Sequence, residues 1–153
     1  MREIVVGVDG SPASNRALDR ALMEADSRGS SASVVSAWTS SDFIAGPPGT
    51  GYGVRASSRD SGQLATKLVE EVVVKAMSRR RSDRSPTMSK IVVHGRPGPA
   101  LVNPGHDAEF LVVGGHGHGY AVSALLGSAT IYGLHHARCP VMVVVGAGPS
   151  AAP

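Results

Sequence analysis

A chain of 153 residues, of which 42% are hydrophobic and 18% charged, is long enough for one globular domain with its own core. Its formal charge is +3 at pH 7, and its single cysteine excludes both an internal disulfide and a cysteine-based zinc site. Because no hydrophobic run approaches the roughly 20 residues of a membrane span, and the first residues lack the features of a signal peptide, we expect a cytoplasmic protein that does not cross a membrane.

The first quarter of the chain predicts a strand, a helix and a second strand. Ile4–Val8 is a continuous hydrophobic run, as in a strand covered on both faces. Ser11 is a natural N-cap, Pro12 suits the first helical position, and alanine and leucine then recur at helical spacing as far as Gly29. The next strand is expected from Ser33 to Thr39.

Residues 40–62, with GPPGTGYG at their centre, predict a long irregular loop, either a lid or a connection without a role. A helix is expected from Leu64 through Ala76, ending in an arginine cluster. The cluster fits a nucleic-acid patch or a solvated helix end, where cations meet the negative end of the helix dipole. Because the chain has only two Phe, three Tyr and one Trp, we favour the helix end and expect no nucleic-acid partner.

The remaining residues predict three more strands and two helices. The strands are expected at Met88–His94, Phe110–Val113 and Cys139–Val145. One helix lies within GRPGPALVNPGHD and is cut short by Pro104 and Gly105, and the other spans Ser128–Arg138. Strand and helix alternate throughout, which favours a parallel sheet with helices on both faces. In such a sheet, ligands bind beyond the carboxyl ends of the strands.

The loop after the fourth strand, GGHGHGY, is the most informative segment. Its glycines either shape a tight crossover or expose N–H groups that, with the following helix start, bind an anion. The segment contains neither the P-loop pattern nor G-x-G-x-x-G, so it does not indicate a P-loop enzyme or a dehydrogenase. It does contain Gly114-x2-Gly117-x9-Gly127-Ser128.

With that spacing, the chain resembles the universal stress proteins, in the subgroup that binds ATP through this glycine motif. IVVGVDGSPASNRAL, GRPGPAL and HHARCPVMVV are similar to other segments of the same family. The resemblance implies a single doubly wound, Rossmann-like domain with a five-stranded parallel sheet in the order 3-2-1-4-5. It places this domain at residues 1–147, with the irregular loop at 40–62 inside it, and we expect residues 148–153 to form a disordered tail.

The resemblance also implies an adenine-nucleotide site. Asp9 would meet the ribose above Gly7, Ala37 would offer backbone groups to the adenine, and the glycine loop with the next helix start would hold the phosphates. The residues implied in binding are Gly7, Asp9, Ala37, Gly114, Gly115, His116, Gly117, His118, Gly127, Ser128, Ala129 and Thr130. Ser128 is also predicted to be the N-cap of its helix.

This chain departs from the family where His116 and His118 replace the usual cations, and no lysine or arginine lies between Arg96 and Arg138. An unperturbed histidine has a pKa of about 6.5, and a nearby phosphate favours its charged form. We therefore predict that ATP affinity rises as the pH falls, unless the histidines have no electrostatic role. No dedicated metal site is expected, and Mg²⁺ would arrive on the ATP phosphates.

The function expected from these observations is that of an ATP-binding regulatory module in a stress response, with no catalytic residues. Cyclic AMP and AMP stay open as ligands, and the alternatives are a nucleotide-free dimeric interaction protein and a slow ATPase. The family resemblance implies a homodimer through the fifth strand. The apolar edge Val141–Val145 is consistent with it, because an uncovered edge strand tends to pair, although the tail is another candidate to cover it.

Overall fold

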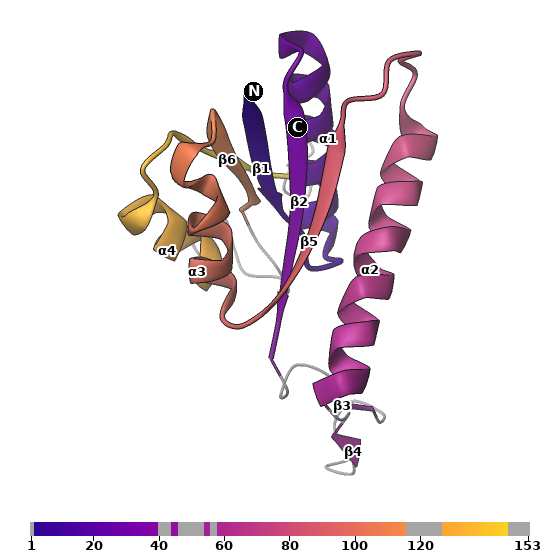
Figure 1. Cartoon of the computed structure of the whole chain (residues 1–153), viewed down its shortest axis with the longest axis vertical. Coiled ribbons are helices and arrows are strands. Elements are labelled where there is room, and N and C mark those ends of the chain that lie inside the picture. Colours follow the sequence, from indigo (N-terminus) through magenta and orange to yellow (C-terminus); the bar gives the residue numbers. More distant parts are fainter. Residues whose placement is uncertain (1, 40–43, 46–53, 56–57, 116–126, 147–153) are drawn as a thin grey trace, which may run out of the picture.

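The computed structural model describes residues 2–39, 44–45, 54–55, 58–115 and 127–146, which form a three-layer α/β structure (Figure 1). The central sheet has five parallel strands in the order β5-β2-β1-β6-β7, which confirms the predicted order 3-2-1-4-5. Its strands are β1 (Glu3–Gly7), β2 (Ser31–Trp38), β5 (Met88–His94), β6 (Phe110–Gly114) and β7 (Val141–Val144). The helices are α1 (Pro12–Arg28), α2 (Ser58–Arg79), α3 (Pro97–Val102) and α4 (Ser128–His136), with a 3-10 turn, η1, at Pro104–Asp107.

The two faces of the sheet are covered by different helices. Helices α1 and α2 pack on the face that carries Ile4 and Val6, whereas α3 and α4 pack on the face that carries Val5 (Figure 1). All three of these β1 side chains are fully buried. A strand buried on both faces needs a continuous hydrophobic run, which is what the sequence of β1 provides.

Helix α1 begins and ends as the sequence predicts. The Ser11 hydroxyl accepts a hydrogen bond from the Ser14 N–H at 3.2 Å, and Pro12 is the first helical residue. At the other end Gly29 takes a left-handed conformation with φ of 65°, and its N–H bonds back to the helix. Glycine is favoured there because it has no Cβ to clash. These two caps set where α1 begins after β1 and where it ends before β2.

The segment predicted to be an irregular loop to Gly62 is shorter than expected, and it is not wholly irregular. Helix α2 already begins at Ser58, and β3 (Ile44–Ala45) pairs with β4 (Val54–Arg55) in a short antiparallel ladder. The error came from treating Gly62 as a loop residue. A Cβ at Gly62 would lie 3.0 Å from Cζ2 of Trp38, so the glycine lets α2 pack closely on that ring, and tertiary packing outweighs the low helix propensity of glycine.

Several other element ends differ by one to three residues from their prediction. Strand β2 begins at Ser31, α4 ends at His136, and β7 spans only Val141–Val144. The short helix before Pro104 is confirmed as α3. Strand β7 lies at the edge of the sheet, as predicted. Residues 148–153, predicted to be a disordered tail, lie outside the described residues.

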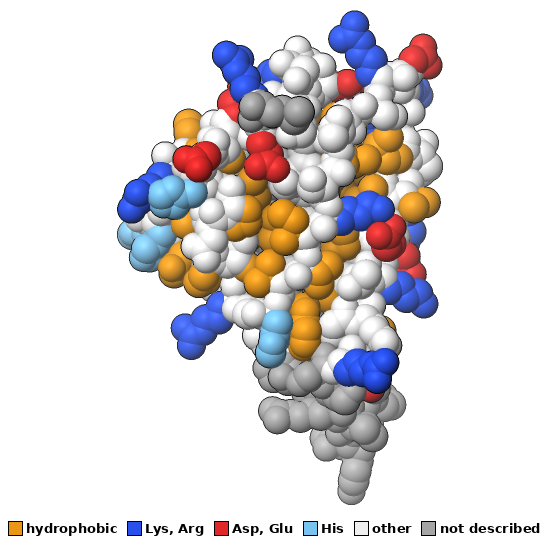
Figure 2. All heavy atoms as spheres, viewed as in Figure 1, with side chains coloured by type: hydrophobic (Ala, Val, Ile, Leu, Met, Phe, Trp, Pro, Cys, Tyr) orange, Lys and Arg blue, Asp and Glu red, His pale blue; other side chains and the backbone are white. Residues whose placement is uncertain are grey.

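The arginine cluster lies where α2 ends, beside the second half of α1. Arg79 pairs with Asp19 at 2.9 Å and Arg80 with Asp26 at 2.5 Å. The cluster is therefore a helix end, as predicted, and it also ties α2 to α1. Figure 2 shows hydrophobic side chains in the middle of one face of the molecule and charged side chains around its upper rim. Among the described residues, no helix is both long enough and apolar enough to cross a membrane.

Candidate functional site

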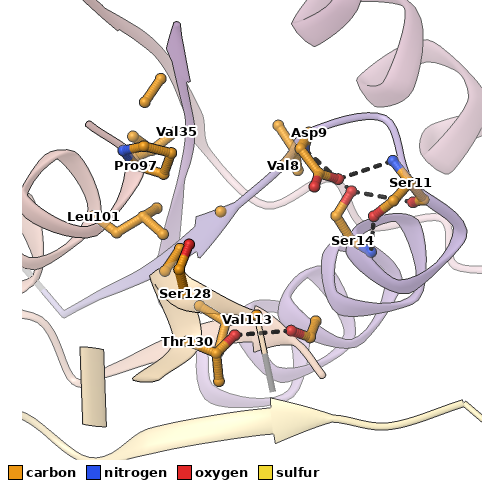
Figure 3. Close-up of a pocket in the computed structure, with 15 residues that line it drawn as sticks. Val8, Asp9, Ser11, Ser14, Val35, Pro97, Leu101, Val113, Ser128 and Thr130 are labelled. Atoms are coloured by element: carbon orange, nitrogen blue, oxygen red, sulfur yellow. Dashed lines mark hydrogen bonds between the residues drawn. The ribbon is translucent and has the colours of Figure 1, made fainter. Parts of the chain in front are cut away.

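A cavity of about 230 Å³ lies at the carboxyl ends of β1 and β6, between the first turns of α1, α3 and α4 (Figure 3). Its walls come from segments that are far apart in the sequence. The lining residues are Gly7, Val8, Asp9, Ser11, Ser14, Val35, Ala37, Pro97, Leu101, Val113, Gly114, Gly127, Ser128, Ala129 and Thr130. Strands β1 and β6 are hydrogen-bonded neighbours, so their carboxyl ends lie side by side at the cavity.

One wall of the cavity is the turn from β1 into α1. The carboxylate of Asp9 accepts a hydrogen bond from the Ser11 N–H at 2.9 Å, and the Asp9 N–H donates to the Ser14 hydroxyl at 3.2 Å. Gly10, with φ of 83°, takes the left-handed conformation that this tight turn requires. These bonds hold the exposed Asp9 in one position at the rim of the cavity (Figure 3). A side chain that positions a polar ligand needs such support.

Three glycines line the cavity, and close packing requires two of them. A Cβ at Gly114 would lie 2.7 Å from the carbonyl carbon of Ala13, so this glycine is needed for β6 to approach α1. A Cβ at Gly7 would lie 2.7 Å from a methyl group of Leu101, which belongs to α3. At Gly127 a Cβ would meet no atom of the described residues within 4 Å. Packing therefore explains Gly114 and Gly7, while no described residue fills the space beside Gly127.

The start of α4 forms the opposite wall. Gly127 is the N-cap residue and Ser128 the first helical residue, so the prediction that Ser128 caps the helix is wrong. The first intrahelical bond runs from the Ile131 N–H to the Gly127 carbonyl at 3.0 Å. The N–H groups of the residues between them have no carbonyl within the helix, and they carry its positive end. The exposed Ser128 hydroxyl therefore does not cap the helix.

Thr130 fixes this helix start relative to the sheet. Its buried hydroxyl donates to the carbonyl of Gly114 at 3.0 Å, which links α4 to the end of β6 (Figure 3). This hydrogen bond therefore links Gly114, the first glycine of the motif, to the helix that begins after its last glycine, Gly127. Thr130 lines the cavity, but its hydroxyl already donates its proton to the Gly114 carbonyl.

Most of the residues predicted for the site come together. Eight of them line the cavity: Gly7, Asp9, Ala37, Gly114, Gly127, Ser128, Ala129 and Thr130. Gly115 does not line it, because its N–H donates to the Val144 carbonyl at 2.9 Å and it faces Val145 of the edge-strand segment. His116, Gly117 and His118 lie outside the described residues.

Sequence reasoning missed the apolar half of the lining and two polar residues, Ser11 and Ser14. Val35, Leu101 and Val113 form an apolar floor, and Ser14 adds a hydroxyl from the first turn of α1. Nothing in the sequence marks these side chains, because each also fits an ordinary core or helix position. An apolar floor with a few polar groups at its rim is the usual composition of a small-molecule site.

The cavity suits part of a nucleotide. Its volume falls somewhat below the roughly 300–1,000 Å³ of typical ligand pockets. A base and sugar over the apolar floor, with phosphates leaving toward the positive start of α4, match the distribution of its groups. No three His, Cys, Asp or Glu side chains gather as metal ligands within the part of the chain that the structure describes.

Comparison with known proteins agrees with this geometry. The model of the universal stress protein family matches residues 1–145. The chain belongs to the universal stress protein family. Universal stress protein Rv2005c of Mycobacterium tuberculosis is 36% identical over 141 residues, which cover 92% of this chain and 44% of that protein. The chain thus spans less than half the length of such relatives, among them Rv2623 of the same organism, at 31% identity and 46% of its length.

Solved structures of the same family share the fold. A universal stress protein from Archaeoglobus fulgidus superimposes with a TM-score of 0.68 at 22% identity, covering 94% of this chain and 98% of that one. A universal stress protein in complex with cAMP gives 0.66 at 24% identity, with coverage of 94% and 96%. An Archaeoglobus fulgidus protein in complex with dAMP gives 0.62 at 21% identity, with coverage of 94% and 97%.

Proposed function

We propose that this domain binds ATP at the cavity between β1 and α4 and acts as a nucleotide-dependent regulatory module in a stress response. The main support is the space beside Gly127, which no described residue fills, at a helix start that lines a cavity with Asp9 on its opposite wall. A phosphate fits such a helix start, because both the dipole and the N–H groups favour an anion. Family members in complex with cAMP, dAMP and AMP support an adenine nucleotide as the ligand.

In this proposal the residues have distinct tasks. Asp9 binds the ribose, and backbone groups of Ala37 at the end of β2 bind the adenine over the apolar floor. Ser128 and the N–H groups that follow Gly127 hold phosphate, together with the glycine loop that contains His116 and His118. Mg²⁺ comes with the phosphates, since it commonly binds through them and few protein ligands.

Binding would act by changing the loop rather than by chemistry. A ligand shifts a protein between two states only if it contacts one of them better, and phosphate contacts to an ordered glycine loop provide that difference. A partner would then recognise the occupied form in the cytoplasm. Efficient phosphoryl transfer usually needs a clamp of cations around the phosphates. Among the described residues that line the cavity there is no lysine or arginine, so we favour binding without efficient turnover.

We further propose a homodimer through the edge formed by Val141–Val145. Strand β7 is an edge strand, and Val145 is 71% exposed. An exposed apolar edge strand favours pairing with a second copy. Light scattering during gel filtration at tens of micromolar protein checks this, and a monomer would remove the dimer while leaving the nucleotide site untouched.

The function itself is tested by identifying what the purified protein carries. Small molecules released on denaturation are analysed by mass spectrometry, and calorimetric titrations with ATP, AMP and cAMP follow. Bound ATP, or ATP as the tightest ligand, supports the proposal. AMP or cAMP alone would change the ligand, and release of ADP with steady phosphate production would favour a slow ATPase. No binding of any of the three would favour a nucleotide-free interaction protein.

A further inference from the structure

One arginine from the start of the chain lies at the edge of the sheet where the glycine loop begins. The loop itself contains no lysine or arginine, since none occurs between Arg96 and Arg138. In the folded chain, however, the guanidinium of Arg16 lies directly against Gly146, the second residue after β7. Gly146 is at the carboxyl end of β7, next to the carboxyl end of β6 where the loop starts.

A continuous set of contacts links this guanidinium to the cavity. The cavity is lined by Gly114 and by Ser14, which is two residues before Arg16. Gly115 comes next in the chain after Gly114. A Cβ at Gly115 would lie 2.9 Å from a methyl group of Val145, the neighbour of Gly146. Arg16 therefore lies beyond Gly114 and Gly115 as seen from the cavity, on the side toward β7. A group extending from the cavity past the end of β6 would approach it.

The charge of Arg16 has no acidic partner within the described part of the chain. Other arginines of α1 do have one: Arg20 pairs with Glu24 at 2.6 Å, and Arg28 with Glu109 at 3.0 Å. Arg16 is also close to the amino end of α1, whose first turn contains no acidic residue. The charge of Arg16 is therefore available to an anion from outside the chain.

We infer that Arg16 is a specificity residue of the nucleotide site, which contacts the outer phosphates of a nucleoside triphosphate and so favours ATP over AMP. This rests on the proposed function. The cavity of about 230 Å³ accommodates only part of a nucleotide, so a chain of phosphates extends outside it. A monophosphate ends at the start of α4, whereas a triphosphate extends further, toward the end of β6 and the guanidinium. An arginine is suited to this task because it stays charged and binds phosphate through paired N–H groups.

Calorimetric titration of the full chain with ATP and with AMP, both in the presence of Mg²⁺, tests the inference. Arg16→Gln should weaken ATP binding about tenfold, as expected for loss of one charge-assisted contact, and change AMP binding less than about twofold. Arg16→Lys should fall between the two, because it keeps the charge and loses the paired geometry. Arg20→Gln is the matched control, since Arg20 lies one turn further along α1 and pairs with Glu24; it should leave both affinities unchanged.

Gly146→Ala supplies a second test that leaves the charge in place. The added methyl group would overlap the guanidinium of Arg16, which is the flexible end of a side chain and can move away without disturbing the fold. ATP binding should weaken a few-fold and AMP binding should not change. ATP binding by Arg16→Gln equal to that of the unchanged protein would overturn the inference and leave the nucleotide site intact. An unchanged protein that binds neither nucleotide would overturn the proposed function as well.

Discussion

The two ends of the sheet use opposite kinds of residues. At the amino end, charged side chains bind one another: Arg28 pairs with Glu109 at 3.0 Å, and Arg80 pairs with Asp26 at 2.5 Å. At the carboxyl end, glycines, serines and an apolar floor surround the cavity, and Asp9 is the one carboxylate among the described residues that line it.

This difference separates residues that hold the fold from residues that are available to a ligand. A charge that already has a partner gains little from a second one, and exposed pairs add modestly to stability. Backbone N–H groups at a helix start, and an arginine that pairs with no acidic side chain of the described residues, are complementary to an anion from outside. The carboxyl end should therefore respond to changes in ligand binding, and the amino end to changes in stability.

The largest expected effect is that of Gly127→Val on nucleotide binding. The valine side chain would project into space that no described residue fills, so it should block phosphate without touching the sheet. We expect ATP affinity to fall about a hundredfold, or about 2.7 kcal/mol, in calorimetric titrations. Thermal unfolding should change little, apart from the weaker capping of α4. ATP binding that survives this substitution would remove α4 from the site.

Gly114→Ala, in the same motif, should mainly lower the stability of the fold. Its Cβ would lie 2.7 Å from backbone atoms of Ala13, which cannot move as a flexible side chain can. Overpacking of this kind costs about 2 kcal/mol of unfolding free energy, measured by urea denaturation. A stable Gly114→Ala protein that has lost ATP binding would show that this glycine serves the ligand rather than the packing of β6 on α1.

A smaller effect is expected from pH on the carboxyl end. His116 and His118 lie within the glycine motif, and a histidine near phosphate gains charge as the pH falls. ATP affinity should rise roughly threefold from about pH 8 to about pH 6. Titrations with a His116→Gln, His118→Gln double variant serve as the control, and it should show a flatter profile. A flat or falling affinity in the unchanged protein would contradict the role of the histidines.

The smallest effect concerns acid stability at the amino end. The Ser30 hydroxyl donates to Glu109 at 2.7 Å, and this bond, together with Arg28, lowers the pKa of Glu109 below its ordinary value of 4.5. A carboxyl whose folded pKa is lowered stabilises the fold above its unfolded pKa, and this contribution is lost as the pH falls through the folded pKa. Glu109→Gln should therefore show a smaller drop in Tm than the unchanged protein between about pH 6 and about pH 3. Equal drops would show that this cluster does not contribute to acid unfolding.

Sequence and structure agree best where local pattern and packing demand the same residue. The hydrophobic run of β1 and the caps of α1 were predictable because a buried strand and a helix end each allow few residue types. Gly62 was misread as a loop residue because the ring of Trp38, which makes a glycine useful there, comes from a distant strand. Ser128 was misread as an N-cap because serine fits that position as well as glycine does.

By itself, the sequence determined the alternation of strands and helices, the glycine motif and the place of Asp9, since each depends on residues close together in the chain. Only the tertiary structure decided that packing explains Gly114, whereas no described residue would contact a Cβ at Gly127. The tertiary structure also brought Arg16 to the edge where a loop without lysine or arginine begins. The physical reason is that steric room and electrostatic potential at a site depend on every group nearby in space. Those groups come from segments that the order of residues leaves far apart.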